Sequence, residues 1–342
     1  MVVTLLRHLD RSLFRFSLAV LDTRNAVFLV DLPDDVEFMD LACKRVRYAL
    51  PELIILIRKL KPDVVFSTLS HLNLAVAILK PLLPNKTRYI ARETSIISHI
   101  LRSYRYSQIW SLLYRWFYKK LDLVVCQSCA MQSDLVMHFK FPESKSIVIN
   151  NPIDLERINA LATEPLAYYG DRDDSIKLIA AGRLSEEKGF DMLIEAVSLL
   201  HTKRIELTLL GEGPLSAQLK QLTEQKGVAN QINFVGFQPN PYAWFAKADA
   251  FVLSSRYEGF PNAMLEAMAC GTPAIATPAP GGTREILDGV DGCVIASDIS
   301  ARALADAIYQ WIGTKRERLN TEVVEPYTVK NIIVAYEQVF SA

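Results

Sequence analysis

The sequence has few cysteines and no long apolar run. Its 342 residues include five cysteines, an odd number that fits reduced thiols better than a disulfide framework. No uninterrupted apolar run reaches the roughly 18 residues that a membrane-spanning helix needs, and neither a repeat nor a low-complexity tract is present. The start, residues 1–8, becomes charged too soon for a signal peptide. We therefore expect a globular protein of the cytoplasm.

Apolar residues make up 50% of the chain, enough for two cores of about 150 residues each. Short apolar runs alternate with longer amphipathic stretches, the pattern of βαβ units with buried parallel strands. The clearest such runs are 63–67, 121–125, 205–210 and 273–277. We predict an α/β protein with two Rossmann-like, doubly wound domains. Their expected limits are 1–152 and 153–326, with a last helix, 327–342, that packs back on the first domain.

Two acidic residues frame the most informative segment, Glu258-Gly-Phe-Pro-Asn-Ala-Met-Leu-Glu266. The run 251–255 before it predicts a buried strand, and the spacing of 263–270 predicts a helix that stops at Gly271. Glu258 is then expected in a loop at a strand's carboxyl end, and Glu266 about two turns into the following helix. Ligands bind at this end of the strands in an open parallel sheet. The spacing alone also fits a capped surface turn with solvated acids.

Two cations lie in a second expected strand-to-helix loop, Gly182-Arg-Leu-Ser-Glu-Glu-Lys-Gly189. Residues 176–181 predict a buried strand and 189–202 an amphipathic helix. Arg183 and Lys188 are therefore expected beside a helix N-terminus, which favours anions. Two cations with nearby backbone N–H groups suit a diphosphate, whose oxygens need charge-assisted donors. A solvated basic loop is the alternative that this segment leaves open.

Taken together, the two loops resemble the donor site of the retaining GT-B glycosyltransferases of family 4, also called glycosyl transferases group 1. This large family includes many bacterial cell-envelope sugar transferases. Further segments match its pattern in order and spacing, although a single glycine pair would be a weak signal. Residues 210–214 are similar to its glycine loop, and residues 234–237 are similar to its nucleotide-base loop. Residues 280–285, with Gly289 and Gly292, are similar to its late glycine turn. Residues 150–154 are similar to its interdomain hinge.

The resemblance implies two Rossmann-like domains facing a cleft. It also implies transfer, with retention, of a hexose or N-acetylhexosamine from a nucleotide sugar, preferably a UDP-sugar, to a lipid-linked oligosaccharide or lipopolysaccharide. No metal or cofactor is implied, since Arg183 and Lys188 would stabilise the departing diphosphate. Glu266 would accept hydrogen bonds from the ribose, and Glu258 would hold the sugar. The implied donor site comprises Gly182, Arg183, Lys188, Gly211, Gly213, Val235, Gly236, Phe237, Glu258, Gly259, Phe260, Pro261, Asn262 and Glu266.

Two other functions remain open. A UDP-sugar epimerase or hydrolase of the same fold would need additional carboxylates or histidines near the sugar, and the sequence shows no such cluster. A truncated, non-catalytic nucleotide-binding relative is suggested by the start of the chain. Residues 1–9 look like the family's first helix and 16–21 like its second strand, so the first strand and its glycine-rich loop are expected to be missing. Such a strand, with about six buried apolar residues, would contribute on the order of 10 kcal/mol.

Charge is unevenly distributed although the net charge is zero. Residues 1–150 carry 21 Lys and Arg against 13 Asp and Glu, and the excess concentrates in 86–120. The helical pattern within 102–120 predicts a core stripe and a surface stripe. The predicted core stripe is Ile109, Leu112, Leu113, Trp116 and Phe117, and the predicted surface stripe is Tyr106, Trp110, Tyr114 and Tyr118, flanked by Arg102, Arg105, Arg115 and Lys119.

Interfacial aromatic residues with cations are typical of a helix that lies on an anionic membrane. Packing of both stripes inside the domain, or lining of an acceptor cleft, is the open alternative. Nucleic acid is disfavoured, because no DNA- or RNA-binding motif accompanies the basic segment.

Two pairs of charged residues complete the candidates. Arg92 and Glu93 follow the run 88–91 at another expected strand end, where they could contact the sugar or the acceptor. Asp171 and Asp173 resemble the carboxylate pair that holds a metal in another glycosyltransferase fold. Because they lie in a polar linker, we interpret them as surface residues.

Overall fold

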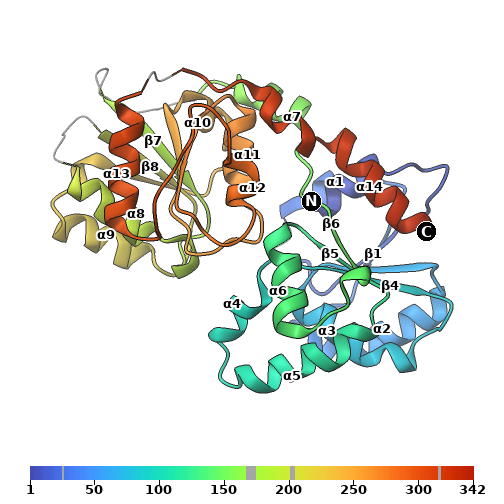
Figure 1. Cartoon of the computed structure of the whole chain (residues 1–342). Helices are drawn as coiled ribbons and strands as arrows, with labels where there is room; N and C mark the ends of the chain where they lie inside the picture. Colours follow the sequence, from blue (N-terminus) through green and yellow to red (C-terminus); the bar gives the residue numbers. More distant parts are fainter. Residues whose placement is uncertain (25–26, 167–174, 201–204, 315–316) are drawn as a thin grey trace. The chain divides into compact units, whose positions relative to one another are not determined.

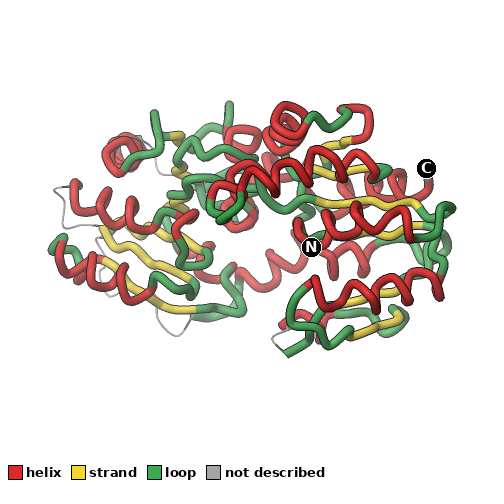
Figure 2. Tube along the Cα trace, turned by 90° about the horizontal axis from the view of Figure 1, so that it is seen from below, coloured by secondary structure: helices red, strands yellow, loops and turns green. Residues whose placement is uncertain are grey.

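The computed structural model describes residues 1–24, 27–166, 175–200, 205–314 and 317–342. These residues form two compact units, one of residues 1–152 with 329–342 and the other of residues 153–328 (Figure 1). In each unit helices lie on both sides of parallel strands (Figure 2). The predicted α/β class with parallel sheets is confirmed. Asp171 and Asp173 lie outside the described residues.

A six-stranded parallel sheet forms the second unit, in the order β12-β11-β10-β7-β8-β9. The chain builds the sheet outward from β7 to β9 and then places β10 on the other side of β7. This reversal between β7 and β10 is a topological switch point, where the loops diverge and leave a crevice for ligands. The strands are β7 (Ile176–Ala181), β8 (Ile205–Leu210), β9 (Ile232–Gly236), β10 (Ala250–Leu253), β11 (Ala274–Ala276) and β12 (Val294–Ile295).

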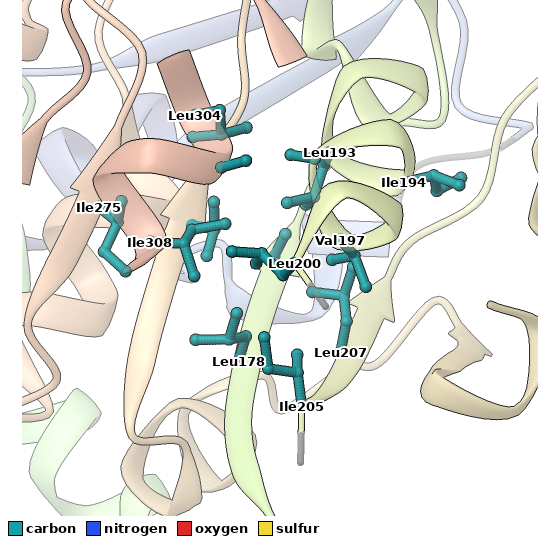
Figure 3. Packing of buried hydrophobic residues seen from close by; sticks show 14 of the residues in the cluster. Leu178, Leu193, Ile194, Val197, Leu200, Ile205, Leu207, Ile275, Leu304 and Ile308 are labelled. Carbon is teal, nitrogen blue, oxygen red and sulfur yellow. The ribbon is translucent and has the colours of Figure 1, made fainter. Parts of the chain in front are cut away.

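Apolar cores cover both faces of this sheet. Leu178 of β7 points to one core, with Leu193 and Ile308 from the helices above it (Figure 3), and its neighbour Ile179 points to the other. Successive side chains of a strand face opposite sides, so strands covered on both faces read as continuous apolar runs. The first core is covered by α8 (Phe190–Leu199), α9 (Ser216–Gln225) and α13 (Ala301–Ile312), the second by α7 (Leu155–Ala162), α10 (Tyr242–Lys247), α11 (Asn262–Ala269) and α12 (Thr283–Leu287).

The first unit contains a four-stranded parallel sheet in the order β3-β4-β5-β6. A separate parallel pair, β1 (Ser17–Val20) and β2 (Glu37–Asp40), is joined to it by no ladder among the described residues. The larger sheet consists of β3 (Val64–Ser67), β4 (Arg88–Arg92), β5 (Leu123–Cys126) and β6 (Ser146–Val148).

Helices cover both faces of the four-stranded sheet. The C-terminal helix belongs to this unit, and Arg88 of β4 donates a hydrogen bond to the Val339 carbonyl at 2.9 Å. One apolar core joins the sheet to α1 (Val2–His8) and α14 (Val329–Ser341). The core on the other face includes residues of α2 (Val46–Leu60), α3 (Ser70–Leu79), α4 (Ile97–Arg102), α5 (Ser107–Phe117) and α6 (Cys129–Phe139).

The predicted assignment of the two stripes around α5 was wrong for most of their members. Tyr114 and Tyr118, predicted on the surface, are 3% and 0% exposed. Ile109, Leu112 and Trp116, predicted in the core, are exposed, the last at 72%. Of the remaining members, Tyr106 is exposed, while Trp110, Leu113 and Phe117 are partly buried against the core.

Hydrogen bonding explains the exchange of the two faces. Tyr118 donates its hydroxyl hydrogen to Glu93, and Tyr114 donates to the Ser70 carbonyl at 3.1 Å. Buried polar groups need partners, and a tyrosine supplies both a donor and a large apolar ring. Helical periodicity shows two apolar stripes but does not show which one faces the core. Here the choice depends on the hydrogen bond that Tyr118 donates to the buried Glu93.

Candidate functional site

Four loops meet at one edge of the six-stranded sheet, because its strands are parallel and their carboxyl ends lie together. The loops follow β7, β8, β9 and β10 and begin at Gly182, Gly211, Phe237 and Ser254. The Leu184 N–H donates to the Glu212 carbonyl at 2.9 Å, and the Gly211 N–H donates to the Gly236 carbonyl at 2.8 Å. The segments predicted to bind a nucleotide sugar are therefore brought to the same edge.

Gly211 and Gly213 allow the loops after β7 and β8 to touch. Gly211 has a φ of +126°, and a Cβ atom there would lie 2.0 Å from the Gly182 carbonyl oxygen. A Cβ atom at Gly213 would lie 2.4 Å from the Leu184 carbonyl oxygen. A side chain at either position would push the two loops apart, which is why glycine is needed here.

Lys188 and Glu258 form an ion pair across the switch point. The Lys188 Nζ atom lies 2.6 Å from Glu258 Oε1, which also accepts a hydrogen bond from the Ser255 hydroxyl at 2.6 Å. Glu258 is 7% exposed and Lys188 is 25% exposed. A carboxylate this buried is tolerated when it is paired and hydrogen-bonded. The sequence singled out Lys188 and Glu258 but did not predict their contact, and it missed Ser255.

The late glycine turn supports the backbone of Glu258. The Glu258 N–H donates to the Pro280 carbonyl at 2.8 Å. A Cβ atom at Gly281, whose φ is +127°, would lie 2.3 Å from the Glu258 carbonyl oxygen. The turn at residues 280–282 therefore packs directly against the loop after β10.

Cationic and apolar groups at this edge remain open to solvent. Arg183 is exposed in the loop after β7, and Phe237 is 55% exposed after β9. Val235 and Gly236 are half-buried at the end of β9. An exposed guanidinium and a partly exposed ammonium group in the same loop suit a multiply charged anion.

Helix α11 carries the second predicted carboxylate. Glu266 lies about one turn inside the helix, nearer its start than the sequence suggested. It is half-buried, and burial raises its pKa to about 7. In the preceding turn Phe260 and Pro261 are buried, and the Asn262 N–H donates to the Phe260 carbonyl at 2.9 Å.

Arg92 and Glu93 lie in the first unit, in a buried polar network. They are 3% and 1% exposed. Glu93 accepts hydrogen bonds from the Ser70 hydroxyl at 2.6 Å, from the Asn73 side chain at 2.7 Å and from Tyr118, while Arg92 donates to Asn151. Burial raises the pKa of Glu93. Contact of either side chain with an acceptor stays a prediction.

Metal ligands were not predicted for this chain. Within the described ranges no group of three or more His, Cys, Asp or Glu is placed to hold a metal ion. Arg183 and Lys188, in the loop after β7, bring positive charge to this edge of the six-stranded sheet.

Comparisons with protein-family models match both units. A model described as glycosyl transferases group 1 matches residues 168–322. A second model, described as glycosyltransferase family 4, matches residues 1–157.

Curated relatives are similar over much of the chain. An uncharacterized glycosyltransferase of Methanocaldococcus jannaschii is 32% identical over 243 residues, covering 68% of this chain and 59% of that protein. The Campylobacter jejuni N-acetylgalactosamine-N,N'-diacetylbacillosaminyl-diphospho-undecaprenol 4-alpha-N-acetylgalactosaminyltransferase is 32% identical over 232 residues, covering 68% and 62%. The chain thus spans about three fifths of the length of these relatives.

Solved structures share the fold. HepE of Anabaena in complex with UDP and glucose superposes with a TM-score of 0.77 at 17% identity, covering 99% of this chain and 94% of that one. Sucrose-phosphate synthase from Thermosynechococcus elongatus superposes with the same TM-score at 16% identity, covering 96% and 88%.

Proposed function

This chain belongs to the glycosyl transferases group 1 family, and we propose that it transfers a hexose or N-acetylhexosamine from a nucleotide sugar to a hydroxyl group of a cell-envelope glycan. The proposed donor is a UDP-sugar, the anomeric configuration is retained, and neither a metal nor a cofactor takes part. The observation that carries the proposal is the cationic edge at the β7–β10 switch point, where Lys188 contacts Glu258 and Arg183 is exposed.

The chemistry assigned to these residues follows the charge that develops during transfer. When the bond from the anomeric carbon to the diphosphate breaks, negative charge grows on the leaving oxygen. Arg183 and Lys188 stabilise that charge, together with the backbone N–H groups of Gly259 and Phe260 near the start of α11. Glu258, already within hydrogen-bond distance of Lys188, holds the sugar hydroxyls near the anomeric carbon.

The nucleoside is assigned to the neighbouring loops. Phe237 and the half-buried end of β9 would contact the base, and Glu266 would accept hydrogen bonds from two ribose hydroxyls. The acceptor is proposed to be a lipid-linked oligosaccharide or a lipopolysaccharide core. Support for this class comes from the name of the Campylobacter jejuni relative and from a Rhizobium meliloti protein named lipopolysaccharide core biosynthesis glycosyltransferase.

Calorimetric titration with UDP, GDP and ADP tests the donor site. We expect UDP to bind most tightly, with the same affinity in EDTA, because no metal is assigned a role. Arg183→Ala should weaken UDP binding about tenfold or more through loss of a charge-assisted contact. Arg302→Ala, which breaks an exposed ion pair on α13, should leave binding unchanged. UDP binding that requires a divalent cation, or UDP binding that is unchanged in Arg183→Ala, would contradict the proposal.

We further propose that α5 places the first unit on an anionic membrane surface at the cytoplasmic face. Ile109, Leu112 and Trp116 are exposed along one face of the helix. The flanking cations Arg102, Arg105, Arg115 and Lys119 are also exposed. Apolar side chains that enter the interface, with cations worth about 1 kcal/mol each near anionic lipid, are what such binding uses. None of the helices within the described ranges is long and apolar enough to span a bilayer.

Vesicle co-sedimentation tests the membrane proposal. Binding should require vesicles that contain an anionic lipid such as phosphatidylglycerol and should weaken at high salt. Trp116→Ala should reduce binding, whereas Tyr309→Ala on α13 should not, although both aromatic residues are 72% exposed. Equal binding to neutral vesicles, or no effect of Trp116→Ala, would contradict it.

A further inference from the structure

The turn that carries Lys188 is held against the loop that carries Glu258 by three successive carbonyl groups. This turn, η5, comprises Glu186–Lys188. The Glu186 carbonyl accepts a hydrogen bond from the Arg256 side chain at 2.6 Å, and the Glu187 carbonyl accepts one from the Arg256 backbone N–H at 2.8 Å. The Lys188 carbonyl accepts one from the Ser254 hydroxyl at 2.8 Å. Residues 254–256 thus supply a donor to every carbonyl of the turn.

Gly189 shows how closely the two segments approach. It follows η5 with a φ of +62°, and a Cβ atom there would lie 2.1 Å from the Ser254 carbonyl oxygen. Glycine is therefore required both for the left-handed conformation and for the contact between the segments.

Arg256 contributes two of the three donors, one from its side chain and one from its backbone N–H, and Asp191 orients the side chain. The two terminal nitrogens of Arg256 lie 2.9 and 2.6 Å from the two carboxylate oxygens of Asp191, which is near the N-terminus of α8. Burial opposes ionisation of Asp191, but the hydrogen bonds from Arg256 lower its pKa below the usual value. The guanidinium therefore joins a carboxylate of α8 and a carbonyl of η5 to its own loop after β10.

We propose that Arg256 is a positioning residue, which, oriented by Asp191, fixes the turn of Lys188 against the loop of Glu258 so that both side chains are preorganised for the donor diphosphate and sugar. This inference rests on the proposed function of the site as a nucleotide-sugar site. Arg256 itself need not touch the donor. Lysine cannot replace it, because three acceptors in a fork arrangement match the planar guanidinium and not a single ammonium group.

A double-mutant cycle on UDP affinity separates positioning from general destabilisation. Arg256→Ala should weaken UDP binding about tenfold, and Arg256→Lys should recover little of this loss. If Arg256 acts through Lys188, the combined Lys188→Ala, Arg256→Ala variant should bind only about as weakly as Lys188→Ala alone. A loss that multiplies in the double variant would overturn the inference, because the two residues would then act independently.

Two controls complete the experiment. Lys226→Ala breaks the ion pair between Lys226 and Glu195, which also joins α8 to a following segment, at 2.7 Å. The two pairs are similarly exposed: the side chains of Lys226 and Glu195 are 35% and 46% exposed, and those of Arg256 and Asp191 are 31% and 44% exposed. It should change UDP affinity less than twofold. Asp191→Ala should reproduce most of the Arg256→Ala effect.

The unsubstituted chain distinguishes failure of this inference from failure of the proposed function. If that chain binds UDP and Arg256→Ala binds it equally well, only the inference is overturned. If the unsubstituted chain binds no UDP, the proposed function is overturned and the inference with it.

Discussion

The carboxyl edges of the two larger sheets both gather charged side chains, but they use them differently. In the second unit, Lys188 and Arg183 of the loop after β7 reach solvent, and Lys188 pairs with Glu258 of the loop after β10. After β4 in the first unit, Glu93 is 1% exposed and accepts hydrogen bonds from three side chains. A charged residue at a strand end can therefore serve a ligand or the fold, and its accessibility distinguishes the two.

The energetic requirements of the charged groups at the two edges also differ. A sealed carboxyl group must have its hydrogen bonds satisfied internally, because a buried acceptor without partners costs about 1–3 kcal/mol. The network around Glu93 meets this need with a tyrosine, a serine and an asparagine. At the second edge Lys188 is partly exposed, so its ammonium group can contact a ligand while it stays paired with Glu258. We therefore expect substitutions to affect transfer at the second edge and stability at the first.

The largest effect is expected from Lys188→Ala. Loss of a cation that stabilises the leaving diphosphate should lower the transfer rate by a factor of about 10²–10³, measured as UDP release from a UDP-sugar that the chain accepts. Glu258→Ala should have a comparable effect, whereas Arg302→Ala should not. Glu93→Gln is the comparison variant. Its transfer rate should fall only in proportion to the fraction of protein that is no longer folded. If Glu93→Gln lowered the transfer rate without lowering stability, the expected difference between the two edges would be contradicted.

A smaller effect, on stability rather than transfer, is expected from Tyr118→Phe. Removing the hydroxyl leaves the buried Glu93 with one donor fewer, which should lower the free energy of unfolding by about 1–3 kcal/mol. Urea unfolding measures the change. Tyr106→Phe is the matched control, because its side chain is 57% exposed and should give a change near zero. Equal effects of the two substitutions would show that the network contributes nothing to stability.

The smallest effect is a pH dependence of donor binding. Burial raises the pKa of Glu266 to about 7, and only its ionised form accepts hydrogen bonds from both ribose hydroxyls. Binding should therefore strengthen as pH rises from 6 to 8, by up to about tenfold, and level off above. UDP-glucose is the suitable ligand, because its diphosphate has no group that titrates near neutrality. Glu266→Gln should abolish the dependence, and a flat profile in the unsubstituted chain would contradict the assignment.

Strand and loop positions could be predicted because they depend on local pattern. The runs 176–181 and 251–255 correspond to β7 (Ile176–Ala181) and β10 (Ala250–Leu253). Glycine and proline mark the loops that follow, since few other residues tolerate the required backbone conformations. The ion pair of Lys188 with Glu258 could not be predicted, because the two residues meet only when β10 is placed beside β7.

Sequence alone determined the α/β class, the family resemblance and the loops that carry the candidate residues, because each follows from short-range periodicity or from the order of motifs. Only the tertiary structure decided which side chains meet and which are sealed. It joined Arg256 to Asp191 and turned Tyr118 inward while Trp116 stayed outside. These outcomes depend on the order of strands and the rotation of helices, which arise from packing between residues far apart in the chain.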